Sequence, residues 1–148
     1  MKYSEIKNLK AFCQFLHSEP SWREVLEQAL SDDDFEVDSV RFIADESIDQ
    51  IQADEMQGDS YVLGLFSAYV IAEVTDWPVA LIEAAQKGEA FEEIGEAMSR
   101  EQVEALQQIR CLADGYGPHF NSYDGNEEEV EINGKLCHVF DNHRFKFL

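Results

Sequence analysis

The chain has 148 residues, a length typical of one domain, and 45% of them are hydrophobic, which is enough to build a buried core. Its 31 acidic and 11 basic side chains give a formal charge of −20 at pH 7. That charge disfavours direct binding to nucleic acid or to an anionic membrane and favours a basic protein partner. We therefore expect one acidic globular domain spanning residues 1–148.

The sequence shows no segment that would direct the chain to a membrane. Its N-terminus begins with an amphipathic pattern and lacks the apolar stretch of a secretory signal. The longest apolar stretch, residues 61–74, is shorter than the ~20 residues that cross a bilayer. Three widely spaced cysteines, Cys13, Cys111 and Cys137, are typical of reduced thiols. A cytoplasmic protein is expected.

Two helices are predicted in the first 30 residues. Apolar residues recur at helical spacing after Ser4, which predicts a helix with Ser4 as its N-cap and Cys13 in its buried stripe. Ser21 and Glu24 have the spacing of a capping box, in which each side chain accepts a hydrogen bond from a free backbone amide. A second helix is therefore expected from Ser21 to about Leu30.

Residues 35–44 are β-forming on both sides of Asp38-Ser39, which predicts a strand or a small hairpin. A third helix follows, capped by Asp45 or Ser47, and Gly58 ends it.

The most apolar helix is expected over residues 61–75. Gly64, Ala68 and Ala72 would give it one face of small side chains, so we expect it to be central and nearly buried. Pro78 predicts the start of the next helix, which ends at Gly88.

A short helix is expected around residues 91–98. Ser99 and Gln102 then form a second capping-box pattern, which opens a helix that stops near Gly115. Residues 115–125 contain three glycines and a proline, so we expect no helix there.

The C-terminal part of the chain predicts a β-hairpin over residues 128–141. Asn133-Gly134 is a strong two-residue turn signal, and the resulting register pairs Val130 with Cys137, which makes Cys137 structural. An isolated hairpin is marginal in water, so it should join the strand or hairpin near 35–44 in a small antiparallel sheet. The expected fold is α+β and mainly helical, with about six helices.

The acidic runs do not match an EF-hand calcium loop, which needs Gly at position 6 and Glu at position 12. Counted from Asp32, these positions hold Val37 and Ile43. Counted from Asp124, they hold Glu129 and Lys135. No dedicated calcium site and no cofactor are expected.

Four residues near the C-terminus are weak candidates for a divalent metal site or for acid–base chemistry: Asp114, His119, Asp124 and His143. Their spacing matches no dense ligand motif. The alternative is that the aspartates cap a helix end and form a turn while the histidines make local hydrogen bonds. No catalytic residue is assigned.

The loop over residues 114–124 also carries the aromatic residues Tyr116, Phe120 and Tyr123. Aromatic side chains on such a loop serve either as anchors for a partner or as plugs that hold the loop to the core. The sequence leaves both alternatives open.

Three functions remain. The favoured one is an acidic binding protein that presents a negative surface to a basic macromolecule, as an inhibitor, an immunity-like protein or a nucleic-acid mimic. The second is a small metal-dependent hydrolase that uses the 114–124 loop and His143. In the third, the acidity serves solubility only. The candidate partner-binding residues are Asp32, Asp33, Asp34, Asp45, Glu46, Asp49, Glu127, Glu128, Glu129, Tyr116, His119 and Tyr123.

Overall fold

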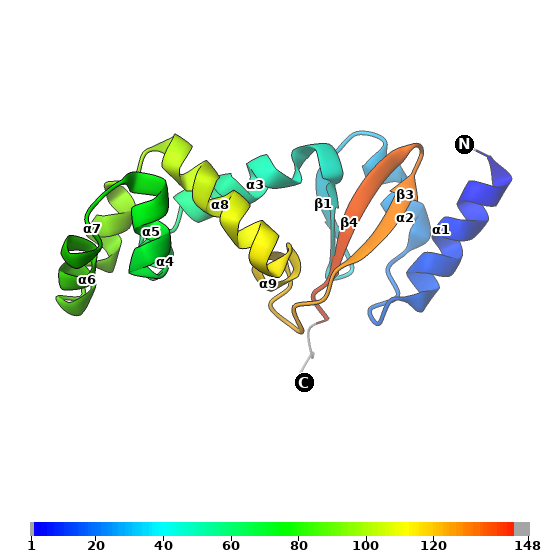
Figure 1. Cartoon of the computed structure of the whole chain (residues 1–148). Coiled ribbons are helices and arrows are strands. Elements are labelled where there is room, and N and C mark those ends of the chain that lie inside the picture. Colours follow the sequence, from blue (N-terminus) through cyan, green and yellow to red (C-terminus); the bar gives the residue numbers. More distant parts are fainter. Residues whose placement is uncertain (1, 144–148) are drawn as a thin grey trace. The chain divides into compact units, whose positions relative to one another are not determined.

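The computed structural model describes residues 2–143 (Figure 1). In that range it has nine helices and one four-stranded antiparallel sheet, which confirms the predicted α+β fold with a small sheet. The expected number of about six helices is too low, because one predicted helix is divided and a short extra helix occurs. Contacts divide the chain into two compact units, residues 1–48 with 114–148 (unit 1) and residues 49–113 (unit 2). The expectation of one domain stays a prediction.

Unit 1 contains the whole sheet, whose strand order is β1-β2-β4-β3. The C-terminal hairpin pairs with β2, as expected from the instability of an isolated hairpin. The elements of this unit are α1 (Tyr3–Phe15), α2 (Trp22–Ala29), β1 (Asp34–Val37), β2 (Val40–Ala44), the start of α3 (Asp45–Gln57), α9 (Gly117–Phe120), β3 (Glu128–Ile132) and β4 (Lys135–Asp141).

The predicted C-terminal hairpin forms, and of the two alternatives left open for residues 35–44 the structure has the hairpin. Each hairpin has a two-residue turn in the left-handed region. The φ angles are 50° at Asp38 and 70° at Ser39 in the first turn, and 53° at Asn133 and 78° at Gly134 in the second. Such a turn matches the right-handed twist of the strands. The register pairs Val130 with Cys137, as predicted.

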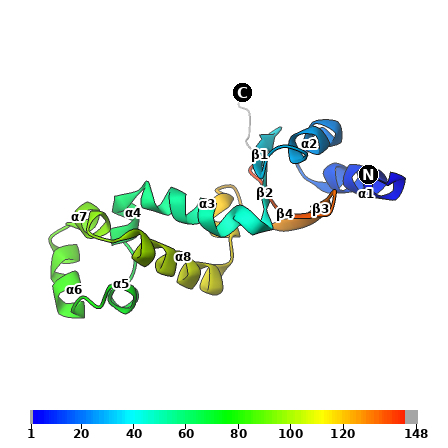
Figure 2. The same ribbon diagram turned by 90° about the horizontal axis from the view of Figure 1, so that it is seen from above.

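The sheet has two different faces because successive residues of a strand point to opposite sides. One face packs against α1 and α2, with α1 on β3 and α2 on β1 (Figure 2). The buried residues of this core are Leu9, Cys13, Leu16, Val25, Ala29, Phe35, Val37, Val40, Phe42, Ile132, Cys137 and Val139. The other face carries Ile43, His138 and Phe140, all buried.

The N-termini of the first two helices differ in how well the sequence predicted them. Helix α1 begins two residues earlier than expected: its N-cap is Lys2 instead of Ser4, and the Lys2 backbone N–H donates to Glu5 Oε2 at 3.4 Å. The predicted Ser21 cap of α2 is confirmed, with Glu24 N donating to Ser21 Oγ at 3.5 Å. The Ser21 N–H itself donates to Asp38 Oδ2 at 3.0 Å, so the first hairpin turn also holds the start of α2.

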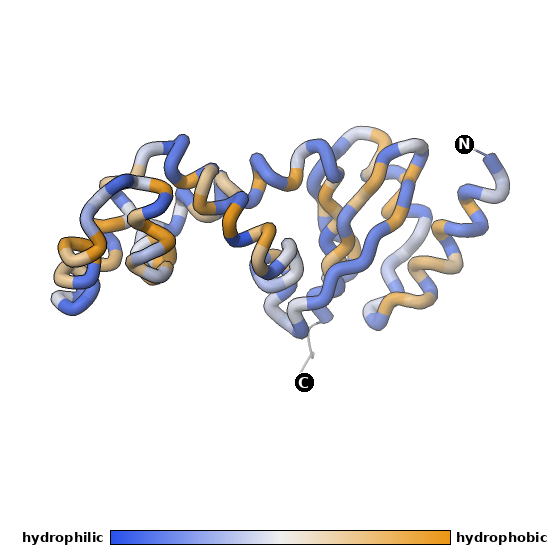
Figure 3. Tube along the Cα trace, viewed as in Figure 1, coloured by the Kyte–Doolittle hydropathy of each residue, from blue (hydrophilic) through white to orange (hydrophobic). Residues whose placement is uncertain are grey.

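Unit 2 is helical, and apolar residues are frequent along its helices (Figure 3). It contains the remainder of α3, then α4 (Ser60–Gly64), α5 (Ala68–Thr75), α6 (Val79–Lys87), α7 (Phe91–Glu96) and α8 (Arg100–Asp114) up to Ala113. The predicted capping box of α8 is confirmed in both directions. Gln102 N donates to Ser99 Oγ at 3.2 Å, and Ser99 N donates to Gln102 Oε1 at 2.8 Å.

The single helix expected over residues 61–75 is wrong, because the chain breaks between α4 and α5. Ser67 Oγ accepts from Tyr69 N at 3.3 Å and caps α5. Gln86 Nε2 donates to the carbonyl oxygens of Gly64 at 3.0 Å and Phe66 at 2.8 Å, which satisfies groups released by the break. The expected stripe of small residues is therefore interrupted. The segment is also not nearly buried, since Tyr69 is 71% exposed.

The expectation that residues 115–125 contain no helix is also wrong. Helix α9 spans Gly117–Phe120 and has Pro118 in its first turn, where the missing N–H of proline costs no hydrogen bond. A Cβ at Gly117 would lie 2.0 Å from the carbonyl oxygen of Gly125, so glycine permits this close approach. Within residues 2–143, no helix has both the length and the apolar composition required to cross a membrane.

Candidate functional sites

His138 lies at the centre of a cluster of acidic side chains in unit 1. It occupies β4 between Cys137 and Val139, which face α1 and α2, so His138 points to the opposite side of the sheet. Its neighbours across the sheet are Ile43 on β2 and Glu129 on β3. The His138 cluster consists of Asp45 at the start of α3, Glu127 just before β3, Glu129 on β3 and His138 itself.

Both ring nitrogens of His138 face carboxylates. Nδ1 lies 2.7 Å from Glu127 Oε2, and Nε2 lies 2.7 Å from Asp45 Oδ1. Glu129 Oε1 is 4.0 Å from Nδ1. Ionised carboxylates only accept hydrogen bonds, so this arrangement favours a ring with a proton on each nitrogen, the cationic form. The ring of Tyr116 also packs against His138, with 5.0 Å between the ring centroids.

The charge of His138 is set by two opposing effects. Burial lowers the pKa of the imidazole, because the charged form loses its hydration. Hydrogen bonds to Asp45 and Glu127, together with the negative charges of these two side chains, raise the pKa by more. The net result is a raised pKa, although the His138 residue is only 4% exposed.

The structure thus brings together four of the predicted partner-binding residues, Asp45, Glu127, Glu129 and Tyr116, around a histidine that the sequence analysis did not select. A signal for it existed. The predicted register that pairs Val130 with Cys137 also places Glu129 opposite His138. Asp45 carried no such signal, since its distance to His138 depends on how β2 pairs with β4.

Three other predicted acidic residues make internal contacts. Asp33 Oδ1 accepts from Lys135 Nζ at 3.0 Å and its Oδ2 accepts from Ser47 Oγ at 2.9 Å; these hydrogen bonds lower the pKa of the Asp33 carboxyl. Arg41 donates to both oxygens of Asp34, at 2.9 and 2.8 Å. In unit 2, Asp49 Oδ1 accepts from Gln107 Nε2 at 2.9 Å. The other predicted acidic residues, Asp32, Glu46 and Glu128, lie exposed in unit 1.

The four weak metal candidates have different surroundings. Asp114 is the last residue of α8 and is exposed. Asp124 Oδ1 accepts from Asn121 Nδ2 at 2.8 Å and from Asn126 N at 2.9 Å, which shapes the loop. The His119 ring packs on Phe120 with 4.6 Å between the centroids.

The fourth candidate, His143, lies beside the chain that connects α1 and α2. Its ring centroid is 4.0 Å from that of His17 and 5.5 Å from that of Tyr123. Ser18 Oγ lies 3.4 Å from His143 Nδ1 and donates to Asp141 Oδ1 at 2.5 Å. In residues 2–143, the group of three metal-ligating side chains with close ligand atoms is Glu127, Glu129 and His138, which includes none of the four candidates.

The aromatic residues of the 114–124 loop divide between the two alternatives. Phe120 is 5% exposed and its ring contacts that of Phe140 at a centroid distance of 5.1 Å, so it holds the loop to the sheet. Tyr116 packs on His138 in the same way. Tyr123 is 44% exposed and remains the aromatic residue of this loop that a partner would reach most readily.

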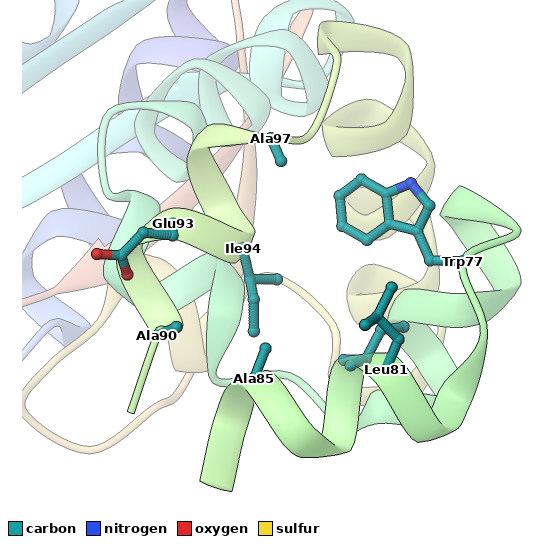
Figure 4. Close-up of a pocket in the computed structure, with 8 residues that line it drawn as sticks. Trp77, Leu81, Ala85, Ala90, Glu93, Ile94 and Ala97 are labelled. Carbon is teal, nitrogen blue, oxygen red and sulfur yellow. The ribbon is translucent and has the colours of Figure 1, made fainter. Parts of the chain in front are cut away.

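A second candidate site is an apolar pocket in unit 2. It has a volume of about 300 Å³ and lies between α6 and α7; we call it the α6–α7 pocket. The indole of Trp77 lies beside Leu81, and Ile94 of α7 and Ala97, the residue that follows this helix, line the opposite side (Figure 4). The charged residue in its lining is Glu93. Leu81 is 64% exposed, so an apolar surface opens to solvent here.

The negative charge is shared equally by the two units. Residues 49–113 contain 13 acidic and three basic side chains, a net charge of −10. Residues 1–48 and 114–148 contain 18 acidic and eight basic side chains, which is also −10. Because unit 2 has only three basic side chains against eight in unit 1, it has the higher ratio of acidic to basic side chains.

Comparison of the chain with protein-family models, with curated proteins and with solved structures yields no match. The fold and the two sites describe an acidic α+β protein that has a cluster of carboxylates around a buried histidine and an exposed apolar pocket.

Proposed function

We propose that this chain is an acidic binding protein that presents a negative surface to a basic macromolecular partner and so acts as an inhibitor, an immunity-like protein or a nucleic-acid mimic. The α6–α7 pocket is the observation that carries the proposal. It offers exposed apolar surface in a unit that holds 13 acidic and three basic side chains. An apolar centre with a polar rim is the usual composition of a protein interface.

The two features contribute differently to binding. Negative charge attracts a basic partner over a distance and raises the association rate, but it is screened by salt. Burial of apolar side chains such as Trp77 and Leu81 slows dissociation and depends little on salt. The matching partner segment is an amphipathic one, with apolar side chains that enter the pocket and Lys or Arg residues at its margins.

The test uses the tagged full-length chain as bait in a cell lysate at low salt, followed by elution with rising salt. Leu81→Asp places a charge in the pocket at an exposed position, so the fold should persist. Leu112→Asp is the matched control, because Leu112 is 87% exposed in the same unit and does not line the pocket. We expect wild type and L112D to capture the same basic protein and L81D to lose it.

The isolated partner should then bind the wild-type chain with an affinity that falls as salt increases. The proposal fails if no basic protein is released by salt, and the acidity then serves solubility. If a basic partner is captured equally by L81D, charge attracts it but the pocket does not bind it. The metal-dependent hydrolase with the 114–124 loop and His143 stays a prediction, and no observation favours it over the binding protein.

A further inference from the structure

The His138 cluster has the composition and arrangement of a metal-binding site, independently of the proposed function. Single ligand atoms from Glu127, Glu129 and His138 all lie within 4.8 Å of one another. The two glutamates approach the same ring nitrogen, Nδ1, at 2.7 Å and 4.0 Å. Metal–ligand distances are ~2.0–2.2 Å, so small rotations of these side chains would bring all three atoms into contact with one ion placed between them.

The opposite ring nitrogen supplies a second, separate observation. Nε2 of His138 is 2.7 Å from Asp45 Oδ1, and the His138 side chain is 6% exposed. A metal-ligating histidine almost always donates its other N–H to a carboxylate or carbonyl, which fixes the tautomer and the ring orientation. Asp45 occupies that position, while the nitrogen that would bind the ion faces the two glutamates. The buried imidazole, with a carboxylate on each side, distinguishes this site from a group of surface carboxylates alone.

We propose that Glu127, Glu129 and His138 bind a divalent transition-metal ion of the Zn²⁺ type, with Asp45 as the residue that orients the imidazole. One imidazole and two carboxylates suit Zn²⁺ and its neighbours better than Mg²⁺ or Ca²⁺, which prefer ligand sets made entirely of oxygen. Three protein ligands leave the fourth tetrahedral position to water.

Binding exchanges the ion for a proton. Nδ1 lies 2.7 Å from Glu127 Oε2, and in the cationic ring the Nδ1–H donates to that oxygen. The ion forms a bond to the Nδ1 lone pair, the N–H bond breaks, and the proton leaves to solvent, so one proton is released for each ion bound. The Nε2 proton stays on the ring and continues to be donated to Asp45. The groups that face the ring are Asp45 from α3, Glu127 and Glu129 from the hairpin, and the Tyr116 ring.

The direct test is calorimetric titration of the full-length chain with Zn²⁺ in a millimolar Mg²⁺ background, which occupies the weak carboxylate sites of this acidic surface. Two buffers with different ionisation heats give the number of protons released. We expect one ion per chain, about one proton released, and a rise in melting temperature on addition of Zn²⁺. A Cys111→Ser chain should behave identically, which excludes the one partly exposed thiol as the ligand.

Glu129→Gln is the most informative variant. Glu129 has a side chain that is 56% exposed and lies 4.0 Å from His138, so its loss should leave the metal-free fold intact. Glu128→Gln makes the same change at the adjacent, exposed position, which faces the other side of β3. We expect E129Q to weaken Zn²⁺ binding at least ~10-fold, the lower limit for loss of an outer-shell partner, and E128Q to leave it unchanged.

The proposal is overturned if Zn²⁺ neither binds nor raises the melting temperature of the wild-type chain. It is also overturned if E129Q and E128Q bind Zn²⁺ as tightly as wild type, since the ion would then lie elsewhere. Asp45→Asn serves as the test of the orienting role. It should weaken Zn²⁺ binding by ~10–100-fold while one ion per chain is retained.

Discussion

Gly64 of α4 and Gly95 of α7 allow the backbones of these two helices to touch. A Cβ at Gly64 would lie 1.9 Å from the carbonyl oxygen of Phe91, and a Cβ at Gly95 would lie 2.0 Å from the carbonyl oxygen of Ser60. Each glycine thus faces the backbone of the first residue of the other helix. No side chain fits between them, because non-bonded carbon and oxygen atoms cannot approach this closely.

Gly95→Ala is therefore expected to destabilise the chain by about 3 kcal/mol or more, the upper range for an overpacked core. The matched control is Gly88→Ala, because a Cβ there would make ordinary contacts of 3.6 Å with Ala84 and Ala85 oxygens. Its effect should lie within about 0.5 kcal/mol. Urea unfolding followed by circular dichroism measures both. Equal stabilities of the two variants would show that α4 and α7 do not cross as described.

Introducing a glycine in the first hairpin turn and removing one from the second should change the stability of the chain in opposite directions. Ser39 has a φ of 70°, a value that costs a residue with a side chain about 1 kcal/mol, whereas Gly134 at 78° bears no such cost. Ser39→Gly should stabilise the chain by about 0.5 kcal/mol after the entropy of the unfolded glycine is subtracted. Gly134→Ala should destabilise it by about 1–2 kcal/mol. The midpoint of urea unfolding measures both, and a shift of the same sign in both variants would contradict the turn geometry.

Thiol reactivity should distinguish the three cysteines. Burial raises the pKa of Cys13 and of Cys137 to about 11 each, so few thiolates form there at neutral pH. Cys111 is partly exposed. We expect a thiol reagent such as DTNB to label one cysteine in the folded chain and three after unfolding in denaturant. Cys111→Ser should remove the labelling of the folded chain, and persistent labelling of that variant would place another thiol at the surface.

The pH dependence of stability should reveal the charge of His138. Its pKa is raised in the folded chain, because hydrogen bonds to Asp45 and Glu127 outweigh the effect of burial. The unfolded chain therefore releases this proton first, at a pKa of ~6.5. The resulting stabilisation is complete below that value and is lost as the pH rises through the raised pKa of the folded state.

The measurement is the free energy of unfolding in urea from about pH 6 to about pH 9, spanning the ordinary histidine pKa of ~6.5, with EDTA present to remove metal ions. We expect the free energy of the wild-type chain to fall across this range. His138→Gln should remove that part of the fall, whatever its effect on overall stability. Identical slopes for the two chains would mean that His138 has the same pKa in the folded and unfolded states.

Several elements could be predicted from the sequence because the interactions that form them are local. Ser21 and Ser99 cap helices through bonds that reach only three residues along the chain. Asp38-Ser39 and Asn133-Gly134 form two-residue turns, and the second turn fixes which residues of its hairpin face each other. Cys13 and Cys137 are buried as expected, since they fall in the apolar patterns of a helix and a strand.

Other features depended on residues far apart in the chain. The local sequence of the apolar segment 61–75 predicts one helix. The break in that segment is stabilised by Gln86, which lies 20 residues beyond Phe66 and donates to the carbonyl oxygens of Gly64 and Phe66. His138 acquires its surroundings from Asp45, which is 93 residues away, and from Glu127 across a hairpin. Local patterns carry no information about such pairs.

The amino-acid sequence by itself determined the large negative charge, the α+β composition, the C-terminal hairpin and the caps of two helices, because each follows from counting residues or from contacts within a few positions. Only the tertiary structure decided that the carboxylates of Asp45, Glu127 and Glu129 surround His138, and that Trp77 and Leu81 border an open apolar pocket. The physical reason is that burial and the pairing of charges depend on distances in space, which folding sets between residues that are remote in the chain.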